Sequence, residues 1–191
     1  MTPPPPSRSR LLDTATDLFY SQGITVTGVD KIAARAGVSK PTLYAQFRSK
    51  ADLVTAVLEH RHDQRVASLD TWVVEHAANP RARLLAVFDW LGEWYATQGP
   101  RGCAFLNAAA EIIDPEHPAR KIIRRHKQWM RDYLASLAEQ AGLPDPERLG
   151  ADLMLLVDGA SARMLVDSDP RAAMDARRVA ALLVEAAGQL S

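Results

Sequence analysis

Apolar residues recur at the three- and four-residue spacing of a helix along almost the whole chain. Runs of alternating Val, Ile and Thr, which would mark strands, are nearly absent. Capping and turn residues divide the helical pattern into about nine segments. We therefore predict an all-α fold of about nine helices. The hydrophobic residues, 47% of the chain, are enough for it to bury a core in one domain or two.

Two short helices joined by a glycine turn are predicted near the start of the chain. Thr27 and Asp30 have the spacing of a capping box that would open the first of them, and Gly37 would end it. Ser39 is a good N-cap for the second, and Pro41 falls in its first turn, where a missing N–H costs nothing. Because glycine accepts a left-handed turn, this order predicts a helix-turn-helix.

The second of these helices carries a polar surface. Its exposed positions hold a cation, hydroxyls, an amide and an aromatic ring: Ser39, Lys40, Thr42, Tyr44 and Gln46. Such a mixture is expected on a helix that enters the major groove of DNA.

The rest of the chain is predicted to form longer helices. Ser49 with Asp52 predicts a second capping box, at the start of a long fourth helix that ends before Asn79-Pro80. Asp145-Pro146 and Asp169-Pro170 each look like an N-cap followed by proline, so they would open the last two helices.

Charge is balanced over the whole chain. The 23 Lys and Arg face 23 Asp and Glu, which excludes a globally basic nucleic-acid binder, so any DNA affinity must come from a local patch. Residues 1–65 carry nine Lys or Arg against six Asp or Glu, whereas the remaining residues carry 14 against 17. The positive excess therefore lies at the end that contains the helix-turn-helix.

Residues 11–58 resemble the DNA-binding domain of the TetR family. The resemblance rests on the LF, G, I-A, A-G-V-S, T-L-Y and F-x-x-K motifs of the family and on a Leu after them. In this sequence the motifs are Leu18-Phe19, Gly23, Ile32-Ala33, Ala36-Gly37-Val38-Ser39, Thr42-Leu43-Tyr44, Phe47, Lys50 and Leu53.

The resemblance implies a transcriptional regulator, by family default a repressor that a small effector releases from a palindromic operator. An enzyme is the first rival, but no nucleophile elbow, phosphate loop, zinc signature or dinucleotide fingerprint is present. The second rival is a helical binding protein that keeps the helix-turn-helix only as a structural element.

The Pro-rich start and the resemblance together predict three parts, and the resemblance implies a set of DNA contacts. Residues 1–8 would be a flexible Pro-rich arm, 9–50 the helix-turn-helix domain, and 51–191 the ligand-binding and dimerisation domain. The arm is expected to be solvated, and the alternative is that it touches DNA. The DNA contacts would come from Thr27, Ser39, Lys40, Pro41, Thr42, Tyr44, Gln46 and Lys50.

Two of these side chains have an alternative role that does not involve DNA. Tyr44 could simply pack against the first helix, and Lys50 could be a solvated charge. Pro41 and Gln46 depart from the residues common in the family at these positions, so no base preference follows from the resemblance.

The second domain resembles the family only in its layout. Family members usually dimerise through their last two helices, which implies a homodimer with an interface at Leu149, Leu153, Leu156, Ala160, Met164, Ala176, Ala180, Leu183 and Ala187. Intramolecular packing is the alternative for these positions. The middle helices would bind a mainly apolar effector through Trp90, Trp94, Phe105, Asn107, Glu111, Trp129, Met130, Tyr133 and Asp158. The alternative is that the aromatic residues form the core of a bundle without a chamber.

The single cysteine, Cys103, excludes an intrachain disulfide and fits a reducing compartment, which predicts a cytoplasmic location. We expect a buried, inert thiol rather than a redox sensor, because Arg101 is the only cation beside it in the sequence. The five histidines lack metal-binding spacing, so neither a metal nor another cofactor is predicted. No run has the length of a membrane span or the pattern of a signal peptide, so no membrane partner is expected.

Overall fold

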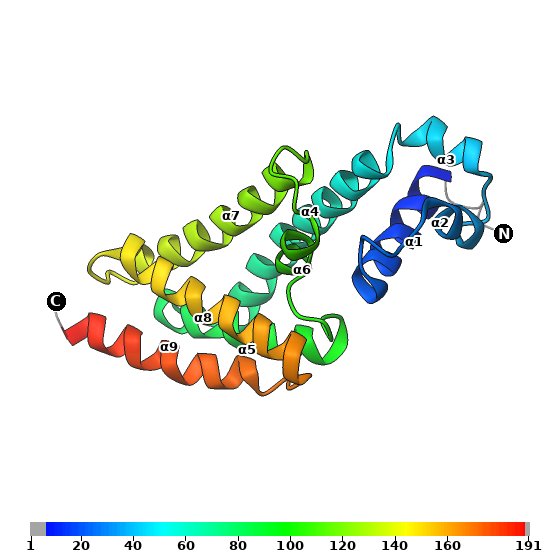
Figure 1. Cartoon of the computed structure of the whole chain (residues 1–191). Helices are drawn as coiled ribbons and strands as arrows, with labels where there is room; N and C mark the ends of the chain where they lie inside the picture. The colour runs from blue at the N-terminus through cyan, green and yellow to red at the C-terminus, as the bar shows by residue number, and fades with distance from the viewer. Residues whose placement is uncertain (1–6, 190–191) are drawn as a thin grey trace. The chain divides into compact units, whose positions relative to one another are not determined.

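The computed structural model describes residues 7–189. Within this range the secondary structure is helical, with nine helices (Figure 1). They are α1 Ser7–Gln22, α2 Val29–Arg35, α3 Lys40–Gln46, α4 Lys50–His76, α5 Pro80–Thr97, α6 Ala104–Glu111, α7 Ala119–Gln140, α8 Pro146–Asp167 and α9 Ala172–Gln189. The predicted fold class is confirmed. Most of the predicted arm, residues 1–6, lies outside the described residues, whereas Ser7 and Arg8 belong to α1, so the arm prediction was wrong at these two positions.

Side-chain caps explain where several helices begin. The Oγ of Ser39 accepts a hydrogen bond from the N–H of Thr42 at 3.2 Å, as predicted. The Oγ of Ser49 accepts from the N–H of Asp52 at 3.0 Å, but the Asp52 carboxylate accepts from Arg48 instead of completing a capping box. The capping box predicted for α2 is absent, because this helix begins after Gly28, which has no side chain to cap it.

The chain forms two compact units. The first contains residues 7–64 and 104–125, and the second contains residues 65–103 and 126–189. The first unit therefore includes α6 and the start of α7 together with α1–α3, whereas the boundary predicted from the sequence falls at residue 50.

In the first unit, α1, α2 and α3 pack against one another in pairs. Leu18, Ile32 and Leu43 are fully buried between them. Gly37 adopts a φ of +66° in the turn between α2 and α3, which is the left-handed conformation that the sequence predicted there. The result is a helix-turn-helix whose two helices are held by an apolar core.

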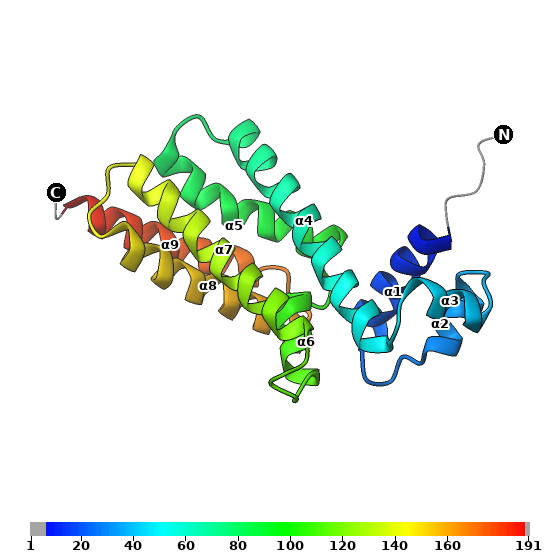
Figure 2. The ribbon, with the colours of Figure 1, turned by 90° about the horizontal axis from the view of Figure 1, so that it is seen from above.

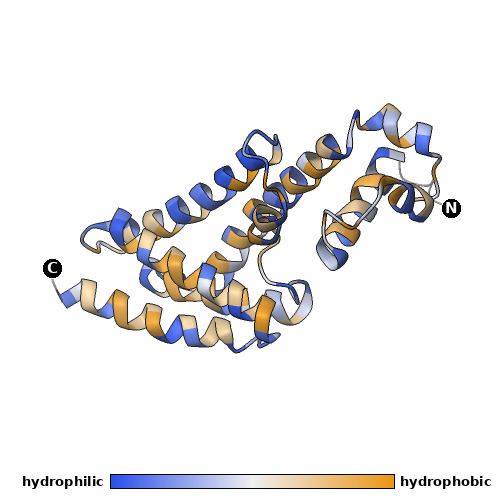
Figure 3. Ribbon diagram, viewed as in Figure 1, coloured by the Kyte–Doolittle hydropathy of each residue, from blue (hydrophilic) through white to orange (hydrophobic). Residues whose placement is uncertain are grey.

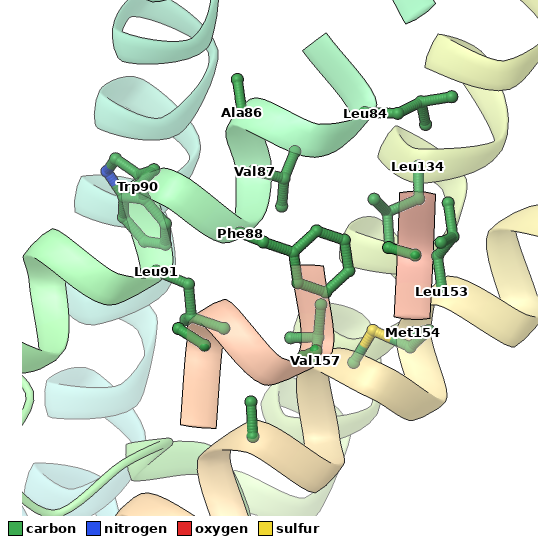
Figure 4. Close-up of a cluster of buried hydrophobic side chains, with 14 of the residues drawn as sticks. Leu84, Ala86, Val87, Phe88, Trp90, Leu91, Leu134, Leu153, Met154 and Val157 are labelled. Carbon is green, nitrogen blue, oxygen red and sulfur yellow. The ribbon is translucent and has the colours of Figure 1, made fainter. Parts of the chain in front are cut away.

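The core of the second unit lies between α5, α8 and α9, together with parts of α4 and α7. Figure 4 shows Phe88 of α5 among Leu134, Leu153 and Val157, which reach it from α7 and α8. The hydroxyl of Tyr95 forms a buried hydrogen bond with the Oγ of Ser161 at 2.8 Å, which ties α5 to α8. In both ribbon views α8 and α9 lie side by side (Figures 1 and 2).

Among the helices of residues 7–189, none combines the length and the apolar composition of a membrane span.

Candidate nucleic-acid interface

The third helix presents a set of polar side chains over one buried residue. Leu43 is fully buried and fixes α3 to the other two helices of the bundle. Lys40, Tyr44 and Gln46 are exposed, and 42% of the Tyr44 surface is open to solvent. Because the buried Leu43 fixes the backbone of α3, these exposed side chains have a fixed point of attachment.

The start of α3 is fixed by Ser39. Its Oγ lies 2.8 Å from the Oγ1 of Thr42, in addition to accepting from the Thr42 N–H. Pro41 is the second residue of the helix and is exposed. The predicted DNA-contact residues from Ser39 to Gln46 are thus gathered on one short helix and its cap.

Thr27 lies in a different environment from the one expected. Its side chain is only 1% exposed, and its Oγ1 donates to the carbonyl oxygen of Gly23 at 2.6 Å. A buried hydroxyl that is already hydrogen-bonded inside the protein cannot also reach a phosphate. The side-chain contact predicted for Thr27 is therefore withdrawn, and its role is to fix the turn between α1 and α2.

Lys50, the first residue of α4, is half-buried. Its Nζ donates to the carbonyl oxygen of Thr25 at 3.3 Å. Burial lowers the pKa of Lys50 below its ordinary value, and the negative charge of Glu111 opposes this shift. Lys50 is therefore not a solvated charge in this structure, because it is tied to the turn before α2.

Two further cations lie beside α3 and were not among the predicted residues. Arg48 lies two residues after the end of α3 and exposes 93% of its side chain while it pairs with Asp52. The guanidinium carbon of Arg8 lies 5.1 Å from the centre of the Phe47 ring, where α3 ends. The position of Arg48 in the sequence was a usable signal, whereas Arg8 lies 39 positions before Phe47 in the chain and only the fold brings it there.

The residues predicted to bind an effector fall in both units. Phe105, Asn107 and Glu111 belong to the first unit, and the other six belong to the second. Glu111 accepts a hydrogen bond from the N–H of Thr25, so its carboxylate is already engaged within the first unit.

The second unit contains an aromatic cluster with a cation against it. The rings of Trp90 and Trp94 are stacked with their centres 6.2 Å apart. The guanidinium carbon of Arg65 lies 4.3 Å from the centre of the Trp90 ring and 4.1 Å from the centre of the Trp94 ring. Both distances are within the range of a cation–π interaction.

Trp129 and Tyr133 form a second stacked pair on α7, with ring centres 6.0 Å apart. The Tyr133 hydroxyl donates to Asp70 at 3.1 Å, and burial together with this bond raises the pKa of Tyr133. Met130 is buried in the core of the unit.

Asp158 forms an ion pair with Lys127, whose Nζ also lies 3.6 Å from the Sγ of Cys103. Cys103 is half-buried, not buried as predicted. The cation beside its thiol therefore comes from a residue 24 positions further along the chain, which the local sequence around Cys103 does not indicate.

Most residues predicted for the dimer interface are buried within the chain itself. Leu149, Leu153, Ala160, Met164, Ala176 and Ala180 belong to the core of the second unit, and Leu156, Leu183 and Ala187 pack against it. Figure 4 shows Leu153 inside this core. The alternative of intramolecular packing therefore describes the six core positions, whereas Leu156, Leu183 and Ala187 are partly exposed and stay predicted interface residues.

Among residues 7–189 no group of three or more His, Cys, Asp or Glu is arranged to hold a metal ion.

Comparison with known proteins identifies two family matches. The family of bacterial regulatory proteins called tetR matches residues 11–57, and the family of tetracyclin repressor-like C-terminal domains matches residues 80–180. The second match alone spans more than half of the chain.

Two solved structures are similar to this chain over nearly its full length. A TetR-family transcriptional regulator from Streptomyces coelicolor has a TM-score of 0.87 and 34% identity, with 95% of each chain covered. A tetR transcriptional regulator from Streptomyces avermitilis has a TM-score of 0.83 and 32% identity, with 96% of this chain and 99% of that chain covered.

One curated relative is similar over part of its length. The transcriptional activator FasR from Mycolicibacterium smegmatis is 38% identical over 87 residues, which cover 44% of this chain and 40% of FasR. Both family matches and both solved structures lead to the same assignment. The chain belongs to the TetR family and is a DNA-binding transcriptional regulator, not an enzyme.

Proposed function

We propose that this regulator binds a palindromic operator through α3 and represses the genes beside it until a small, mainly apolar effector releases it. The observation that carries this proposal is the surface of α3. Lys40, Tyr44 and Gln46 are exposed there, while Leu43 beneath them is fully buried.

The chemistry of these three side chains suits double-stranded DNA. A glutamine amide can form two hydrogen bonds with the major-groove edge of adenine, which makes Gln46 the residue for base recognition. Lys40 and the Tyr44 hydroxyl suit phosphate oxygens, which fix the position of the helix in the groove. Arg8 and Arg48 add positive charge at the other end of α3.

Recognition of a palindrome requires two copies of α3 about 34 Å apart, and hence a homodimer. Support comes from an exposed stripe on α8, formed by Leu155, Gly159, Ala162 and Val166 at helical spacing. Leu155 is 71% exposed and Val166 is 79% exposed. Figure 3 shows apolar segments along both α8 and α9.

The middle of the stripe is made of small residues. A Cβ on Gly159 would meet no atom within 4 Å, so this position is open to a partner helix. Small residues at the centre let two helices approach closely. On α9, Met174 and Leu182 also expose large apolar side chains, and α9 packs against α8. We therefore propose the stripe, together with Leu182, as the seam between two copies of the chain.

The aromatic cluster of the second unit is the proposed effector contact. Trp90 is buried and Trp94 is half-buried, and Arg65 of α4 lies over both rings, so an effector that stacks on these rings would have to displace Arg65. Since α4 runs without a break from residue 50 to residue 76, a ligand that displaced Arg65 would act on the helix that begins next to α3.

An activator is the second candidate, and the similarity to FasR favours it. The two candidates share the DNA surface and differ only in where the operator lies relative to the promoter. A cytoplasmic location follows for either of them.

The experiment is selection of DNA sites by the purified protein from a random pool. The expected result is enrichment of a palindrome with two half-sites about one helical turn apart. The double variant Lys40→Ala, Tyr44→Ala should fold and enrich nothing. Enrichment of the same site by this variant would refute the role of α3. A reporter gene placed behind the selected site then distinguishes repression from activation.

A further inference from the structure

The last residue of α6, Glu111, is hydrogen-bonded to the turn between α1 and α2. Its Oε2 accepts from the backbone N–H of Thr25 at 2.8 Å, across 86 positions of sequence. Gly23 in the same turn has a φ of +98°, and a Cβ at this position would lie 3.1 Å from Oε2. The turn is thus shaped to receive this carboxylate closely.

Lys50, the first residue of α4, also binds Thr25. Its Nζ donates to the carbonyl oxygen of Thr25 at 3.3 Å. Both backbone groups of Thr25 are therefore bound by side chains, one from α6 and one from α4. Neither α1 nor α2 contributes to these two bonds.

Packing around this turn leaves space. A small void lies between α1, α4 and α6, and the centre of a water molecule can occupy about 20 Å³ of it. This is room for about one water molecule. Most of its lining is apolar: Phe19, Ile24, Val54, Val57, Leu58 and Ala108. Ile24, the neighbour of Thr25, lines this void, so the turn is incompletely packed on this side and the two hydrogen bonds of Thr25 add to its fixation.

We propose that Glu111 is a positioning residue for DNA binding, because its bond to Thr25 fixes the α1–α2 turn and with it the placement of Lys50 and of the helix-turn-helix. The proposal rests on the proposed binding of an operator through α3. Without this bond the turn gains conformational freedom, which must be lost again when DNA binds. DNA affinity then depends on whether α6 keeps Glu111 in place.

The test compares two neutral variants, Glu111→Gln and Glu111→Met. Both remove the negative charge and both have similar size and helix propensity, but only glutamine keeps an oxygen that can accept from Thr25. Operator binding by Glu111→Met should be about tenfold weaker than by Glu111→Gln, since a hydrogen bond of this kind is worth about one power of ten. Glu116→Gln, which removes an exposed carboxylate five residues later, is the control for charge.

Hydrogen exchange of the Thr25 amide gives the second readout. It should be faster in Glu111→Met than in Glu111→Gln, while the amide of Leu43, which begins the last turn of α3, should exchange equally in both. Equal operator affinity of the two variants would overturn the proposal, and so would equal exchange at Thr25. A wild-type protein that selects no operator would instead refute the proposed function.

Discussion

The ammonium group of Lys40 lies 2.8 Å from the carboxylate of Asp30, so the cation at the start of α3 is paired with α2. Both side chains are largely exposed. The hydrogen bond to Asp30 and its charge raise the pKa of Lys40. A phosphate that binds Lys40 must therefore compete with Asp30.

Replacing Asp30 with asparagine should increase DNA affinity. The competing carboxylate is lost, while the Lys40 ammonium remains charged. We expect a gain of about two- to fivefold at low salt that shrinks as salt is added, because exposed ion pairs are weak and screened. Fluorescence anisotropy with the selected operator measures it. Asp17→Asn removes an equal charge from an exposed position of α1 and should give a smaller gain. An equal gain from both variants would show that the pair does not restrain Lys40.

Neighbouring residues of α3 should respond in different ways to mutation. Leu43→Ala deletes a fully buried side chain and should destabilise the protein by about 2–5 kcal/mol. Tyr44→Phe keeps the ring and should leave the melting temperature nearly unchanged while weakening operator binding. Thermal unfolding and anisotropy separate the two effects. A Tyr44→Phe protein that binds DNA as wild type would exclude a contact through the hydroxyl.

Local signals in the sequence predicted the helices well. Ser39 and Asp145 cap helices through hydrogen bonds that span only three residues, so a short stretch of sequence is sufficient to identify them. The prediction for Thr27 was wrong. Its spacing to Asp30 is that of a capping box, but its hydroxyl donates a hydrogen bond to the carbonyl oxygen of Gly23. A hydroxyl has two local choices of partner, and spacing does not distinguish them.

Contacts between distant segments could not be predicted in this way. Helix α8 has two apolar faces, and periodicity alone does not tell which one packs within the chain. Leu153 proved to be internal, whereas Leu155 is exposed. The hydrogen bond between Glu111 and Thr25 joins residues 86 positions apart, and no sequence motif indicates it.

The exposed stripe on α8 predicts a dimer that charge can break. Leu155→Glu combined with Val166→Glu places four carboxylates in the seam of a symmetric dimer, so the protein should become monomeric and lose most of its operator affinity. Light scattering measures the mass. Leu165→Glu is the matched control, since Leu165 is exposed on α8 but lies off the stripe. If the double variant remains a dimer, the seam lies elsewhere.

Acid should weaken the folded state through His62. Burial lowers the pKa of His62, and the charge of Arg125 adds to this effect against the opposing charges of Asp63 and Glu59. The unfolded chain therefore takes up the proton first as the pH falls through about 6.5, and stability decreases between about pH 7 and 5. Thermal melts should show a smaller decrease for His62→Gln than for wild type. His60→Gln, on the same helix, should follow the wild type, and identical pH profiles for all three proteins would contradict the assignment.

The salt dependence of operator binding by wild type and Lys40→Ala tests most directly whether α3 faces DNA in a dimer. Each phosphate contact contributes about 0.9 to the slope of log affinity against log salt concentration. A dimer uses Lys40 twice, so we expect the magnitude of the slope to fall by about 1.8 in the variant. An unchanged slope would mean that Lys40 meets no phosphate and would contradict the account.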